Sequence, residues 1–243
     1  MSNRSRFGFR RMNRSLAAIV TEEGVSSAIA LAAYTDASDP IYGTGYDGDV
    51  TISSNTTLTQ DMYYNNLTIN ASCTLNTAGY RVFVKNLLSM GNASVLGFTT
   101  GSSTAGSIGA GGAAGTAVTN SLGGSSATQT ATAPTAALGG SKYWYQPMQA
   151  VRGWATTASS PTPTFLNGGA GGVGQAGGGV VIVAARYISS SATTTNAKIA
   201  APATAPAGGG VVIVISSGTA LPSNVSTDVT GQNSGTAIYI QVT

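Results

Sequence analysis

From about residue 42 onward, apolar and polar residues alternate over short stretches of the chain. The alternating stretches are residues 49–52, 57–59, 66–70, 73–75 and 80–85. Apolar residues that alternate with Thr or Asn fit the two faces of a β-strand, and the short spacing between stretches is typical of many short strands. The first part of the chain therefore predicts an all-β fold.

A seven-residue sequence motif, Gly-Gly-Gly-Val-Val-Ile-Val, occurs twice, at 177–183 and at 208–214. A continuous β-branched run predicts a strand that is buried on both faces. Two copies about thirty residues apart predict stacked turns of one β architecture. With a closing strand predicted at 237–242, the expected fold is either a stacked β-solenoid or a compact β-sandwich.

The sequence divides into four regions by composition. Residues 1–40 form an N-terminal arm, 41–98 are rich in predicted strands, 99–179 are a low-complexity loop region of Gly, Ala, Ser and Thr, and 180–243 form a C-terminal β segment. We expect 41–243 to be one β domain. The glycine runs at 109–115 and 168–179 are predicted to pack backbone against backbone where only glycine fits, as at the axis of collagen.

Positive charge is concentrated in the N-terminal arm. The formal net charge is +3, but five of the eleven basic residues lie within the first fourteen, which leaves six basic residues against eight acidic ones. No basic surface then remains for nucleic acid as a main partner. We expect the arm to be extended, partly helical over 15–23 and 26–34, and to dock on a protein shell. Its docking residues are predicted to be Arg4, Arg6, Phe7, Phe9, Arg10, Arg11 and Arg14.

The composition excludes several kinds of catalytic site. The chain has no histidine and one cysteine, Cys73, which excludes histidine-dependent hydrolysis and thiolate metal sites. We expect no enzyme activity and no cofactor. A pair of carboxylates, Asp49 and Asp61, is the alternative to consider for glycan cleavage. Asp47 and Asp49 are a weak calcium candidate, although an Asp-Gly turn before a strand is the favoured interpretation.

Aromatic residues in the low-complexity region are candidates for binding. Tyr143, Trp144, Tyr145 and Trp154 are expected either to anchor contacts between subunits or to stack on the sugars of a host surface. No apolar stretch approaches the roughly twenty residues of a membrane span, so a membrane is not an expected partner. We expect assembly in the cytoplasm.

Three segments resemble a known class of proteins. They are Asp47-Gly48-Asp49-Val50-Thr51-Ile52, the stretch 57–69, and the stretch 74–84, followed later by the glycine tracts at 177–183 and 208–214. Together they resemble glycine-rich structural proteins of tailed bacteriophages, over about residues 45–217. The glycine tracts here are shorter and diluted by Ala, Ser and Thr.

The resemblance implies a structural protein on the exterior of a phage virion. Because of the basic arm, the first expectation is a capsid-associated cement or decoration protein that stabilises the shell, with the major capsid protein or another virion protein as partner. The alternatives are a receptor-binding adhesin or tail component that contacts a host surface glycan, and a glycan-cleaving appendage. We also expect a homo-oligomer, with a trimer as first choice.

Overall fold

The structure is a computed structural model that describes residues 40–98, 115–118, 121–131, 154–157 and 160–242. The docking residues predicted in the arm, the glycine run at 109–114 and the aromatic residues Tyr143, Trp144 and Tyr145 lie outside the described residues. Trp154 lies in a described strand, but only its backbone is described.

Two parallel sheets make up most of the described chain. The larger sheet contains β1 (Asp49–Ile52), β3 (Met62–Tyr64), β4 (Asn66–Ile69), β6 (Val82–Met90), β10 (Val180–Ser190), β12 (Val211–Ser216) and β14 (Thr236–Gln241). The smaller sheet contains β2 (Thr56–Thr57), β5 (Thr74–Asn76), β7 (Val95–Gly97), β11 (Ala197–Ala200) and β13 (Val225–Asp228). The helix in the described residues is one 3-10 turn, η1 (Pro40–Tyr42). The prediction of an all-β fold is confirmed.

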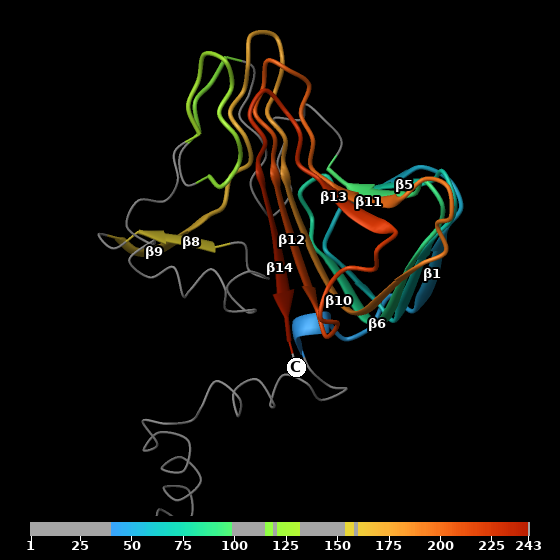
Figure 1. Cartoon of the computed structure of the whole chain (residues 1–243). Helices are drawn as coiled ribbons and strands as arrows, with labels where there is room; N and C mark the ends of the chain where they lie inside the picture. The colour runs from blue at the N-terminus through green and yellow to red at the C-terminus, as the bar shows by residue number, and fades with distance from the viewer. Residues whose placement is uncertain (1–39, 99–114, 119–120, 132–153, 158–159, 243) are drawn as a thin grey trace, which may run out of the picture.

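The chain passes back and forth between the two sheets (Figure 1). It runs from β1 in the larger sheet to β2 in the smaller one, returns to β3 and β4, and continues in this way to β14. Neighbouring strands within each sheet pair in parallel, as β4 does with β6 and β5 with β7. Two parallel neighbours need a crossover connection between them. Here that connection contains a strand of the other sheet, as β11 lies between β10 and β12 in the chain.

The two copies of the repeated motif form two adjacent strands. β10 pairs with β12 so that Val180 faces Val211, Ile182 faces Ile213 and Val183 faces Val214. The two copies therefore lie in the same register, residue beside residue. The repeat therefore corresponds to neighbouring parallel strands of one sheet.

The apolar side chains of the larger sheet are buried on both faces. Alternate residues such as Val181, Val183 and Val212 point between the two sheets and pack with Leu75 and Ile199 of the smaller sheet. The residues between them join a second cluster on the outer face of the larger sheet. Its members are Ile41, Tyr42, Phe83, Leu166, Val180, Ile182, Ala184, Val211, Ile213, Ile215, Ile240 and Val242. Burial on both sides explains why β10 and β12 are continuous apolar runs.

A third, two-stranded sheet lies within 99–179, the region that the sequence predicts to be a low-complexity loop region. β8 (Trp154–Thr157) and β9 (Ser160–Phe165) form an antiparallel hairpin in which Trp154 faces Phe165. From the sequence alone, Pro161 and Pro163 would argue against a strand over β9. In a two-stranded ribbon, however, each strand has an outer edge on which a missing N–H costs nothing.

Candidate functional site: a glycine layer and the loops it holds

Glycines outside the strands pack backbone against backbone at one end of the larger sheet. We call this group the glycine layer. It comprises Gly123, Gly124, Gly168, Gly169, Gly172, Gly177, Gly178, Gly208, Gly209, Gly210, Gly231 and Gly235. For each of them, a Cβ atom would lie less than 3.0 Å from a backbone atom of another segment. Only glycine permits such an approach without displacing the chain. Within 168–179 the prediction is confirmed at five glycines, whereas a Cβ on Gly174 would meet no atom and one on Gly179 would meet the Phe98 side chain.

Hydrogen bonds join the segments of the glycine layer. Gly169 donates its N–H to the carbonyl of Gly178 at 2.8 Å, Gly178 donates to Gly208 at 3.0 Å, and Gly124 donates to Gly209 at 2.7 Å. Because a buried backbone donor without a partner is costly, these bonds allow a layer that is not a β-sheet to be buried.

The bonding pattern differs from that of a strand. Along 208–210, three consecutive amides donate to three different neighbours: Ala170, Asn233 and Ala201. In a strand, the backbone N–H groups point alternately to two sides. In a chain of polyproline II type, with three residues per turn, the backbone groups point in three directions and are free to bond to neighbours. The glycine layer therefore bonds in several directions at once.

The layer gathers four loops at one end of the molecule. The loops are residues 115–131 as far as described, 170–177, 201–209 and 229–235, and Figure 1 shows them side by side at the upper end. Hydrogen bonds tie them together: Gly115 donates to Gly172 at 2.8 Å, Ala127 to Pro206 at 3.1 Å, and Asn233 Nδ2 to the carbonyl of Ser125 at 2.9 Å. The loops thus form one connected surface.

The described residues of this surface carry no charged side chain. Its exposed groups are hydroxyls, amides and small apolar side chains, and Val173 is 70% exposed at the end of its loop. Such a surface offers hydrogen bonds and apolar contact without long-range electrostatic attraction.

Asp47 and Asp49 have structural partners. Asp47 accepts the N–H of Tyr63 at 2.6 Å, and Asp49 accepts from Nδ2 of Asn65 at 2.7 Å and from Nδ2 of Asn66 at 2.9 Å. The two asparagine amides hold the pKa of Asp49 below its usual value. These bonds fit the turn interpretation, and the calcium site stays an untested prediction. The described residues contain no group of three or more His, Cys, Asp or Glu side chains that could bind a metal.

Asp61 is engaged elsewhere than Asp49. Its carboxylate forms an ion pair with Arg81 and accepts the backbone N–H of Arg81 at 2.8 Å. Asp49 pairs with Asn66 in the neighbouring strand. Along β6, Met62 (next to Asp61) faces Val82, whereas Leu67 (next to Asn66) faces Leu88, and six strand residues span about 20 Å. Paired glycosidase carboxylates lie within about 10 Å of each other. This geometry gives no support to a catalytic pair of Asp49 and Asp61.

A buried tyrosine next to these turns gives a prediction for alkaline pH. Burial, together with the negative charge of Asp47, raises the pKa of Tyr64 to about 12. Because the folded pKa exceeds the unfolded value of about 10, the stabilisation is complete below pH 10 and is lost as the pH rises towards 12. Between pH 9 and pH 11.5, denaturant titration should show about 2 kcal/mol less loss of unfolding free energy for Tyr64→Phe than for the unmodified protein.

The control for this prediction is Tyr46→Phe, because the Tyr46 side chain is 89% exposed. It should lose as much stability as the unmodified protein over the same pH interval. Equal pH dependence of the Tyr64→Phe and Tyr46→Phe variants would refute the assignment to Tyr64.

Comparison of the chain with protein-family models, curated proteins and solved structures finds no match. Among the described residues, no helix is both long and apolar enough to cross a membrane.

Proposed function

We propose that this protein is a structural component of the exterior of a phage virion, and that its four gathered loops bind a partner surface. The single observation that carries the proposal is the glycine layer, which holds four uncharged loops together at one end of two parallel sheets. The resemblance of residues 45–217 to glycine-rich phage structural proteins supports the assignment to a virion.

The strand order supports the β-solenoid over the β-sandwich. Each turn of the proposed solenoid supplies one strand to the larger sheet and one to the smaller sheet, as β10, β11, β12 and β13 do in sequence. A sandwich joined by hairpins would contain antiparallel pairs, whereas the pairs within the two main sheets are parallel. The stacked turns form a stiff base for the loops.

Pre-ordering of the loops favours binding as their role. A loop that orders only on binding loses conformational entropy, and a loop already held in place avoids much of that cost. Hydroxyl and amide groups on such loops can form hydrogen bonds with the hydroxyls of a host surface glycan. Because the loops are already ordered and carry no charge, we propose the receptor-binding adhesin ahead of the capsid cement.

Adsorption competition tests the proposal. Purified protein, added to host cells of the virus that encodes it, is expected to block virus adsorption. A triple variant that places charge on the loops (Val173→Lys, Thr204→Lys, Gln232→Lys) is expected to need at least about tenfold more protein for the same inhibition. All three side chains are exposed, so the fold should tolerate the changes.

A matched control carries the same charge near β1, away from the four loops (Figure 1). Thr51→Lys, Ser53→Lys and Thr59→Lys replace exposed residues near β1 and β2, and this variant should inhibit adsorption as the unmodified protein does. Failure of the unmodified protein to block adsorption, together with its binding to virus heads, would replace the adhesin by the cement function. Equal inhibition by both triple variants would show that the loops do not bind.

A further inference from the structure

The larger sheet ends at β1 on one edge and at β14 on the other, and neither has a further partner strand among the described residues. β14 lies at the end of the strand order and pairs with β12 on one side only. Thr236 donates its N–H to the carbonyl of Gly210 at 3.2 Å, and Val242 donates to Ser216 at 2.8 Å. Since backbone groups of a strand point alternately to its two sides, the N–H and C=O groups of Ala237, Tyr239 and Gln241 point to the open side.

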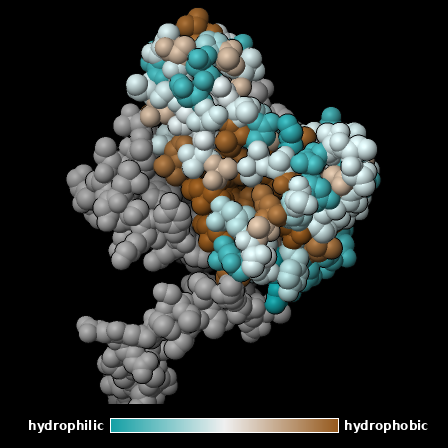
Figure 2. Space-filling view, viewed as in Figure 1, coloured by the Kyte–Doolittle hydropathy of each residue, from teal (hydrophilic) through white to brown (hydrophobic). Residues whose placement is uncertain are grey.

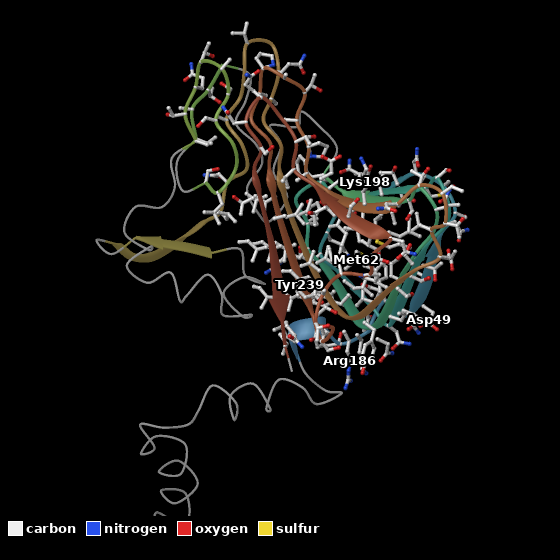
Figure 3. All side chains as sticks on the ribbon, in the orientation of Figure 1. Asp49, Met62, Arg186, Lys198 and Tyr239 are labelled. Carbon is white, nitrogen blue, oxygen red and sulfur yellow. The ribbon has the colours of Figure 1, made fainter. Side chains whose placement is uncertain are left out.

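This edge lacks the features by which proteins protect open strands. Exposed edges are normally kept from pairing by charged side chains, prolines, bulges or short length. β14 is six residues long, Thr-Ala-Ile-Tyr-Ile-Gln, with neither charge nor proline, and it pairs with β12 in continuous register. At the opposite edge, β1 has four residues and carries exposed Asp49. Figure 3 shows Asp49 and Tyr239 at these opposite sides of the sheet.

β14 and its partner strand β12 contain no charged residue. After Lys198, the remaining sequence contains one charged residue, Asp228, and Lys198 forms an ion pair with it at 3.0 Å. Figure 2 shows hydrophobic residues gathered on the face that β14 and β13 present. Two identical copies of this surface would meet without electrostatic repulsion.

We propose that β14 is an interface at which a second copy of this chain adds its own β14 in antiparallel orientation, centred on Tyr239. In that register, Tyr239 of each copy exchanges both backbone hydrogen bonds with Tyr239 of the other. Ala237 of each copy pairs in the same way with Gln241. The residues required for a hydrogen-bonded pair are those whose backbone groups point to the open side. The six strands from β1 to β14 in the order of the larger sheet would then continue into the same six strands of the second copy.

A second copy fits this edge better than a different partner. A twofold contact uses the same surface from both sides, so the surface must be compatible with itself, and an uncharged strand is. A strongly charged partner would find no complementary charge here. Pairing at a single edge joins copies two at a time, so this contact gives a dimer; the trimer expected from the sequence would need a different surface.

The test measures self-association of the full chain by sedimentation equilibrium. The variant Ala237→Pro/Gln241→Pro removes two N–H groups that point to the open side and leaves the pairing of β14 with β12 intact, since edge strands tolerate proline at such positions. We expect a dimer for the unmodified protein and a dissociation constant at least about tenfold higher for the proline variant. Ala237→Thr/Gln241→Thr, which keeps both donors, is the control and should dimerise like the unmodified protein.

Hydrogen exchange of residues 236–242 provides a second readout. Protection of this segment should increase with protein concentration in the unmodified protein and in the threonine control, and not in the proline variant. A monomer at all concentrations up to about 100 μM, a trimer, or a proline variant that dimerises normally would overturn the proposal. Loss of dimerisation on deletion of residues 1–39, with the proline variant unaffected, would assign the contact to the N-terminal arm instead.

Discussion

Replacing Gly235 by alanine should lower the free energy of unfolding by about 3 kcal/mol, or Tm by about 6–12 °C. The added Cβ would overlap the carbonyl oxygen of Gly210 and come within 2.8 Å of the carbonyl carbon of Gly209. Both contacts are with backbone, which cannot rotate away as a side chain can. The glycine layer would have to separate, and the hydrogen bond from Gly235 to Val229 would be strained. Thermal unfolding followed by calorimetry measures the effect.

Gly218→Ala is the matched control for this prediction. Gly218 lies outside the glycine layer, its φ is not in the left-handed region, and the first atom that a Cβ would meet is the Tyr239 hydroxyl oxygen at 3.3 Å. Its substitution should change stability by no more than about 0.5 kcal/mol. If Gly235→Ala and Gly218→Ala destabilised equally, close backbone packing would not be what requires glycine in the layer.

Phe98 and Gly179 should show strong energetic coupling at the junction of the sheets with the glycine layer. Phe98 is 1% exposed in the core between the sheets, and Phe98→Ala is expected to cost about 3–5 kcal/mol. A Cβ on Gly179 would lie 2.5 Å from Cγ of the Phe98 ring. In the double variant, the new methyl would occupy space that the ring has left. The losses of unfolding free energy in Phe98→Ala and Gly179→Ala should therefore sum to at least about 1 kcal/mol more than the loss in the double variant.

The comparison for this cycle is Gly179→Ala combined with Leu67→Ala. Leu67 is also fully buried between the sheets, but it is not among the nearest neighbours of a Cβ on Gly179. These two losses should add to within about 0.5 kcal/mol. Unfolding in denaturant gives all the values, and additivity in the Phe98 cycle as well would argue against the direct contact.

The strands could be predicted from the sequence because their signals are local. Alternation over 49–52 identifies β1 with the bounds observed, and the repeated Val-Val-Ile-Val identifies β10 and β12. The sequence does not predict the short strands β7, β11 and β13, since three or four residues contain too little periodicity. Sheet order depends on contacts between distant residues, so the sequence alone does not distinguish a solenoid from a sandwich.

The glycine layer was predictable only in part. The segment 168–179 predicts close backbone packing because eight of its twelve residues are glycine. Gly231 and Gly235 are isolated in the sequence, and they belong to the layer because the fold brings Gly209 and Gly210 against them. An isolated glycine is equally common in a turn, so no local signal distinguishes these two. The same holds for the gathering of the four loops, which depends on contacts between segments as distant as Ser125 and Asn233.

Amide hydrogen exchange of the glycine segments tests the central claim most directly, namely that the layer is a rigid hydrogen-bonded unit that fixes the four loops. The account predicts that the amides of Gly169, Gly178, Gly208 and Gly209 exchange as slowly as those of β10 and β12, because each is buried and donates a hydrogen bond. Exchange at the rates of an open loop, with β10 and β12 still protected, would mean that the loops are not held and would contradict the account.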